Sequence, residues 1–214
     1  MEFSRARTNE QKQQRIEDVA KATAYLYDTL PYEEITFAAI AKETGFARSN
    51  LYIYFSSKEE ILLHILICDM QSWYEQIESS FHVRRSYTIE ETMEVWTDAL
   101  VQNERHLSLL SILFTVLEKN VTVEALTKFK EDLLEIQLKC YQLLQGLFPS
   151  APDDELQQFL LSSFALAQGL YPMTRLTKVQ MKAIENCALG YVPPNFRDSY
   201  LKASIQLLQG ILEK

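Results

Sequence analysis

Residues 35–62, ITFAAIAKETGFARSNLYIYFSSKEEIL, predict two short helices joined by a tight turn. Thr36 can cap the first of these helices, and Gly45 stands just past its end, where helices commonly finish in a left-handed residue. The second helix is expected over about residues 48–55. Such a pair packs at a steep angle, so the second helix is presented outward.

Helical signals continue on both sides of this stretch. Between residues 11 and 30, apolar side chains recur every three or four positions, as in an amphipathic helix. Ser57 and Glu60 form a capping box that opens a long helix over about residues 58–81. The apolar segment 106–119 predicts a helix buried nearly all round. Further helices are expected over residues 88–103, 122–148, 152–171, 178–189 and 196–212.

The composition favours an all-α chain and excludes several classes of protein. Of 214 residues, 47% are hydrophobic but only five are glycine and six proline, too few for the turns of a multi-stranded sheet. No apolar stretch approaches the ~18 residues of a membrane-spanning helix, and the polar N-terminus does not resemble a signal peptide. The three cysteines, Cys68, Cys140 and Cys187, are far apart, which is typical of a reduced cytoplasmic protein.

The charge is distributed unevenly along the chain. The formal net charge is −8, yet residues 1–58 carry eight basic and eight acidic residues. Residues 59–214 carry the other 13 basic residues and 21 acidic ones. A neutral N-terminal part can contact phosphate, whereas the acidic remainder is not expected to.

The second short helix carries side chains that can read DNA. In a major groove Arg48 can pair with guanine and Asn50 with adenine, with Ser49 between them. Residues suited to phosphate oxygens are Tyr52, Tyr54 and Lys58. Each of these residues alone is more often an ordinary surface residue, but the complete ordered string favours DNA binding.

The string LYIYFSSKEE at residues 51–60 resembles the signature of the TetR/AcrR family of bacterial transcriptional regulators. The resemblance covers about the first 75 residues. It implies a helix-turn-helix head over residues 1–57, with the motif at about 36–55, and a helical effector-binding and dimerisation domain over residues 58–214. It also implies a homodimer that binds a palindromic operator in double-stranded DNA, usually as a repressor released by a small ligand.

The resemblance also implies roles for individual residues. Base contacts are implied for Arg48, Ser49 and Asn50, and phosphate contacts for Thr36, Tyr52, Tyr54 and Lys58. Ala47 stands where the family often has a Ser or Thr that caps the recognition helix and touches phosphate. Losing such a cap costs about 1 kcal/mol, so we expect this helix to be slightly frayed without DNA. Ser49 replaces a frequent glycine and can alter the choice of operator.

The rest of the chain supplies candidates for a ligand pocket and a dimer interface. A largely apolar effector would lie among aromatic side chains, and the candidates are Trp73, Trp96, Phe114, Tyr141, Phe164 and Tyr171. Two apolar stripes resemble the helices that form a four-helix dimer interface in this family. They consist of Leu156, Phe159, Leu160, Ser163, Phe164 and Ala167, and of Leu201, Ile205, Leu208 and Leu212. Both sets are alternatively explained as the core of one subunit.

No pattern indicates catalysis, a cofactor or a metal. The sequence has no glycine-rich phosphate loop and no HExxH, and its three histidines leave few groups for acid–base chemistry. His64 and Cys68 are spaced as ligands on one helix face but lack a third. The main alternative to a regulator is a helical ligand-binding or protein-interaction module with a degenerate DNA-binding head, which the net charge of −8 favours.

Overall fold

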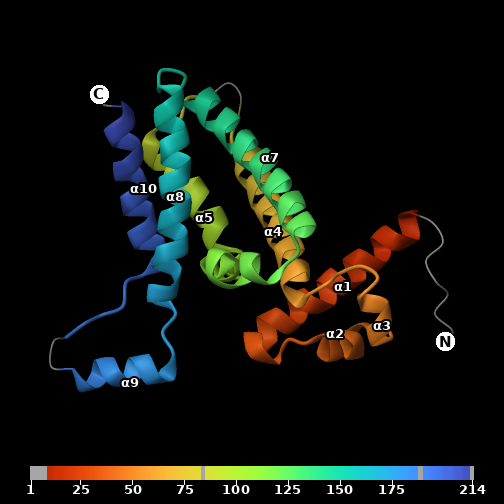
Figure 1. Cartoon of the computed structure of the whole chain (residues 1–214). Helices are drawn as coiled ribbons and strands as arrows, with labels where there is room; N and C mark the ends of the chain where they lie inside the picture. The colour runs from red at the N-terminus through yellow and green to blue at the C-terminus, as the bar shows by residue number, and fades with distance from the viewer. Residues whose placement is uncertain (1–8, 83–84, 188–189, 213–214) are drawn as a thin grey trace. The chain divides into compact units, whose positions relative to one another are not determined.

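The computed structural model describes residues 9–82, 85–187 and 190–212 of the chain. Over these residues the chain forms helices and turns without a β-strand, which confirms the all-α prediction (Figure 1). None of the helices in this part of the chain combines the length and the apolar character needed to cross a membrane.

The helices divide into two compact units. The first comprises the chain up to residue 68 and residues 113–132, and the second comprises residues 69–112 and the chain from residue 133 onward. Helices α4 (Lys58–Ser80) and α7 (Val123–Leu147) each contribute to both units. The boundary expected after residue 57 lies inside the first unit, because the start of α4 belongs to it.

The first unit contains one long helix followed by two short ones, and local interactions fix both ends of the middle helix. The Thr36 hydroxyl accepts a hydrogen bond from the Ala39 amide (3.2 Å), and Gly45 ends the second helix in the left-handed conformation with φ of 71°. Both helix ends agree with the sequence prediction. The helices are α1 (Asn9–Thr29), α2 (Phe37–Thr44) and α3 (Arg48–Leu51), and a 3-10 turn at Tyr32–Glu34 precedes the second of them.

Aliphatic side chains anchor these helices from inside. Ile35, Ile40 and Leu51 have no exposed surface. Burying one such side chain stabilises the fold by about 1.5–3 kcal/mol, a large contribution for a helix as short as α3. The burial of Leu51 therefore determines which side chains of α3 remain at the surface.

The second unit is a bundle of longer helices. In Figure 1, α8 and α10 run alongside each other, whereas α9 stands apart and buries none of its residues. Besides parts of α4 and α7, the unit contains α5 (Ile89–Val101), α6 (Glu104–Ser111), α8 (Asp153–Thr174), α9 (Lys178–Asn186) and α10 (Phe196–Leu212).

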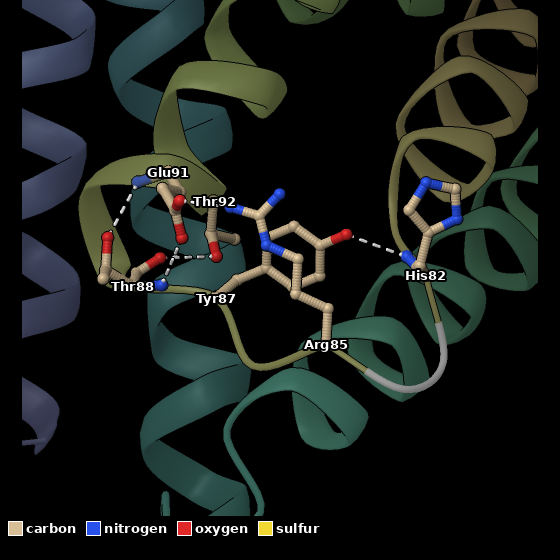
Figure 2. Close-up of polar contacts among 6 residues, drawn as sticks. All are labelled: His82, Arg85, Tyr87, Thr88, Glu91 and Thr92. Atoms are coloured by element: carbon tan, nitrogen blue, oxygen red, sulfur yellow. Dashed lines mark hydrogen bonds and ion pairs between the residues drawn. The ribbon is translucent and has the colours of Figure 1, made fainter.

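The start of α5 is fixed by a capping box and by an aromatic contact. The Thr88 hydroxyl accepts from the Glu91 amide (3.1 Å), and the Glu91 carboxylate accepts from the Thr88 amide (3.0 Å), at the residue where the sequence predicts that this helix begins. Figure 2 shows that the Tyr87 hydroxyl accepts from the His82 amide (2.9 Å). The Arg85 guanidinium lies 4.7 Å from the centre of the Tyr87 ring and pairs with Glu91. These contacts set where the α4–α5 connection ends.

The segment expected as one buried helix over residues 106–119 is divided. Helix α6 ends at Ser111, a π-helical turn follows over Leu113–Leu117, and a 3-10 turn ends the segment at Glu118–Asn120. A π-helical turn has more residues per turn than an α-helix, so it changes which side chains face inward. Phe114 is 46% exposed as a result, which corrects the expectation that this segment is buried all round.

The two apolar stripes expected at a dimer interface lie largely in the core of the subunit. Leu156, Phe159, Ser163, Ala167 and Leu208 are buried, and Leu160, Phe164, Leu201, Ile205 and Leu212 are half-buried. The five buried residues pack against helices of their own chain, as the alternative explanation of these stripes has it, and their contact with a partner stays a prediction. Helical periodicity marks the face that is buried but not the chain that buries it.

Candidate functional site

The candidate DNA-reading helix α3 is shorter than predicted and lacks a cap. Its regular part ends at Leu51, and the amides of Tyr54 and Phe55 then donate to the Leu51 carbonyl (both 3.0 Å), so the expected helix over 48–55 continues as turns. Ala47 has the extended conformation of an N-cap residue but makes no side-chain capping bond. The sequence predicted this missing cap.

The residues expected to read bases lie on the accessible side of α3. Arg48 and Ser49 are exposed and Asn50 is half-buried. The Arg48 guanidinium donates to the Tyr52 hydroxyl at 3.4 Å, a long contact. The Tyr52 ring packs edge-on against Phe37 with ring centres 4.5 Å apart, yet half of its side-chain surface is exposed. Tyr52 is thus held in place while its hydroxyl stays near Arg48.

Lys58 is held by Tyr32 rather than left free. Its ammonium donates to the Tyr32 carbonyl (2.8 Å) and lies 3.7 Å from the centre of the Tyr32 ring. The Tyr32 hydroxyl in turn donates to the Glu59 carboxylate, which is buried. Burial, followed by this hydrogen bond, raises the pKa of the Tyr32 hydroxyl, so it remains a donor. The sequence did not indicate a role for Tyr32. Its partners Lys58 and Glu59 lie 26 and 27 positions further along the chain, and no local sequence pattern links residues so far apart.

The start of α4 beside Lys58 is capped almost as predicted. The Ser57 hydroxyl accepts from the Glu60 amide (3.1 Å). The Glu60 carboxylate accepts from the Ser56 amide (2.6 Å), one residue before the position that a capping box uses. The two bonds keep Lys58 in the first turn of α4.

The second unit contains an apolar cavity of about 60 Å³. Three of the aromatic residues expected in an effector pocket line it: Trp73, Trp96 and Phe164. The other three do not. Phe114 belongs to the first unit, Tyr141 is half-buried and accepts a hydrogen bond from Gln145, and Tyr171 lines a neighbouring pocket. The composition indicated the right type of residue, but the orientation of each helix determines which aromatic side chains line the cavity.

Two polar atoms of the residues around this cavity have no partner. Trp73 Nε1 and His106 Nδ1 are buried without a hydrogen bond among the described residues. Their rings lie 5.8 Å apart, and both residues line the cavity. Burial lowers the pKa of His106 to about 4, although nearby Asp69 acts in the opposite direction. Buried polar groups are normally hydrogen-bonded, so this part of the cavity wall suits a water molecule or a ligand that carries a polar group.

Two family models divide the chain between them. Residues 19–65 match the model described as bacterial regulatory proteins, tetR family. Residues 68–214 match the tetracyclin repressor-like C-terminal domain, which is more than half of the chain. The chain belongs to the TetR family.

Individual relatives of this TetR-family chain include regulators of fatty acid metabolism. It is 27% identical over 115 residues to the fatty acid metabolism regulator protein of Bacillus subtilis (strain 168). That match covers 54% of this chain and 53% of the relative, so the chain spans about half the length of the curated relative it matches.

Solved TetR-family structures share the fold at low sequence identity. A TetR transcriptional regulator from Streptomyces coelicolor aligns with a TM-score of 0.62 and 15% identity, covering 92% of this chain and 97% of that one. The regulator FadR from Bacillus subtilis in complex with stearoyl-CoA aligns with a TM-score of 0.54 and 15% identity, covering 90% and 96%. At these identities the likeness shows the fold alone.

The uncapped start of α3 gives a first prediction for this TetR head. Ala47→Ser places a hydroxyl where it can accept from an amide of the first turn, so it should raise the free energy of unfolding by about 1 kcal/mol. Denaturant titration followed by circular dichroism measures this change. Ala183→Ser, at an exposed position inside α9, adds the same hydroxyl where the backbone amides are already bonded within the helix, and it should not stabilise. Equal effects of the two substitutions would contradict the missing cap.

The buried histidine gives a second prediction. Because the pKa of His106 is about 4 in the folded chain and 6.5 ordinarily, the unfolded chain binds more protons between these values. Stability should therefore fall by about 3 kcal/mol as the pH is lowered from 6.5 toward 4, given 1.36 kcal/mol per pKa unit. Urea titrations across this range measure it, with His106→Phe as the variant lacking the titrating group. An unchanged pH dependence in His106→Phe would disprove the assignment.

Proposed function

We propose that this chain is a cytoplasmic transcriptional regulator that binds a palindromic operator in double-stranded DNA as a homodimer, and that a small ligand releases it. The exposed side chains at the start of α3, beside the buried Leu51, are the observation that carries this proposal. A helix anchored in this way can enter a major groove with its first turn. Repression is the mode of action that the family resemblance favours.

In this proposal the first 57 residues bind DNA, and residues 58–214 bind the effector and the second subunit. The bases are contacted by Arg48, Ser49 and Asn50. The residues at the DNA backbone are Thr36, Ala47, Tyr52, Tyr54 and Lys58. Lys58 would exchange the Tyr32 carbonyl for a phosphate oxygen, which is a better partner because it is charged. Thr36 already uses its hydroxyl as a cap, so its phosphate contact would come from the same oxygen or from its backbone.

We propose that the dimer forms through the outer faces of α8 and α10. Leu161 and Leu207 are exposed there, as are Gly169 and Gly210. A Cβ on either glycine would meet no atom of the chain within 4 Å, so the subunit itself does not require their small size. Small residues let a partner helix approach closely, which is what a four-helix interface needs.

The cavity lined by Trp73, Trp96 and Phe164 is the proposed effector site. Its apolar lining suits a hydrophobic ligand, and the likeness to a fatty acid metabolism regulator and to FadR solved with stearoyl-CoA supports an acyl compound. The cavity of about 60 Å³ is small, so such a ligand would have to displace side chains. This displacement gives the ligand different affinities for two conformations, as a switch requires.

The proposed switch is a shift of population between conformations that fit the operator and conformations that do not. The helices α4 and α7 are continuous through both compact units, so they are the elements that can transmit the change. A ligand that prefers one conformation a hundredfold contributes about 2.7 kcal/mol to the shift.

Selection of bound sites from random duplex DNA tests the function. We expect enrichment of a palindrome, with an affinity that falls steeply with salt because phosphate contacts displace counterions. Asn50→Ala should relax the preference at individual base pairs, whereas Lys58→Ala should weaken all sequences alike. Asn50→Ala should keep the melting temperature of the parent, and Lys58→Ala, which loses its bond to the Tyr32 carbonyl, should still be folded at the assay temperature.

No enrichment by folded protein at low or high salt would favour the second candidate function, a ligand-binding or interaction module with a degenerate head. The net charge of −8 and the intramolecular partners of Lys58 are the observations in its favour.

A further inference from the structure

A second pocket adjoins the apolar cavity at one end of the second unit. It has a volume of about 260 Å³ and, unlike the cavity, has charged residues in its wall, among them Arg175 and Arg197. Arg175 follows the last residue of α8, and Arg197 lies in the first turn of α10. No role is assigned to this pocket by the proposed function, which uses the apolar cavity alone.

The same four helices contribute lining residues to the cavity and to the pocket. Helix α5 contributes Leu100 to the cavity and Val101 to the pocket, and α6 contributes His106 and Leu107 in the same way. On α8 and α10 the corresponding residues are one turn apart, about 5.4 Å along the helix. These are Ala167 and Tyr171 on α8, and Tyr200 and Phe196 on α10. The cavity and the pocket are therefore successive levels of the same four helices.

Aromatic rings separate the two levels. Phe196 stacks on Tyr200 with ring centres 5.4 Å apart, and Tyr171 meets Phe196 edge-on at 5.9 Å. Tyr200 faces the cavity, and Tyr171 and Phe196 face the pocket. A partition made of side chains can open by rotation, which would join the apolar cavity to the arginine-bearing pocket.

Both arginines form ion pairs with carboxylates of the same chain. Arg197 donates to Asp98 on α5 (2.6 Å), and Arg175 pairs with Glu104 on α6. All four side chains are 40% or more exposed. Exposed pairs contribute only about 0–1 kcal/mol each, so another anion can replace these carboxylates at little cost.

We infer that the effector is an anionic amphiphile whose apolar chain lies in the cavity and whose carboxylate or phosphate is bound by Arg175 and Arg197. This inference rests on the proposed function and names the chemical class of its effector. Asp98 and Glu104 occupy the arginines in the ligand-free protein. Binding of the anion then breaks the ion pair between α5 and α10 and the one between α6 and α8, which makes the head group part of the switch.

The two tryptophans of the chain, Trp73 and Trp96, both line the cavity, so their fluorescence reports its occupancy without DNA. The probes are dodecanoate, dodecanol, dodecanoyl-CoA and free CoA, titrated against the full-length protein. Dodecanoate should bind more tightly than dodecanol. Arg175→Gln and Arg197→Gln should each weaken dodecanoate roughly tenfold, the loss expected for a charge-assisted hydrogen bond, and should leave dodecanol unchanged.

Asp98→Asn and Glu104→Gln are the matched controls, because they break the same ion pairs from the other side. They should strengthen dodecanoate binding, by about two- to fivefold, since they remove the competing carboxylate. A structural role for the ion pairs would instead make the arginine and carboxylate variants weaken binding alike. Unchanged melting temperatures establish that the variants are folded.

The probes also identify the source of the anion. Dodecanoyl-CoA binding that depends on both arginines supports a phosphate, and arginine-dependent dodecanoate binding supports a carboxylate. Equal affinities for dodecanoate and dodecanol, unaffected by the arginine variants, would overturn the anionic subsite. Fluorescence that responds to no probe, in protein that still selects an operator, would overturn the inference and leave the DNA-binding proposal standing.

Discussion

The burial of Leu51 is the constraint on which the head depends. Helix α3 has a single regular turn and no side-chain cap, so it has little stability of its own. Leu51, which has no exposed surface, fixes it from inside, six residues after the left-handed Gly45 that ends α2. Arg48 and Ser49 are then exposed and Asn50 is half-buried, so the first turn of α3 stays accessible. The candidate DNA-reading surface is thus a consequence of one buried side chain.

In the second unit, polar groups lie around an apolar interior. The cavity wall holds two buried polar atoms without partners, and the neighbouring pocket holds arginines whose partners are exposed carboxylates. Neither arrangement gives much stability to the folded chain, since unsatisfied buried atoms cost free energy and exposed ion pairs contribute little. Both arrangements fit the ligand site that we propose.

Local features of the fold could be predicted from the sequence, and tertiary features could not. The ends of helices at Thr36, Gly45 and Thr88 depend on a few neighbouring residues, and the structure has them where the sequence predicts. The surroundings of Phe114 and Leu156 could not be predicted, because they depend on distant segments. Phe114 lies in a π-helical turn and is exposed, and the subunit's own helices bury Leu156. The contact between Lys58 and Tyr32 could not be predicted from the sequence for the same reason.

In the proposed regulator, two heads on one dimer read two successive major grooves. Hydroxyl-radical footprinting of the protein on its selected DNA tests this arrangement. We expect two protected patches on the same face of the duplex, about 34 Å or one helical turn apart, which both disappear in Arg48→Ala. A single patch, or protection that is independent of sequence and survives Arg48→Ala, would contradict it.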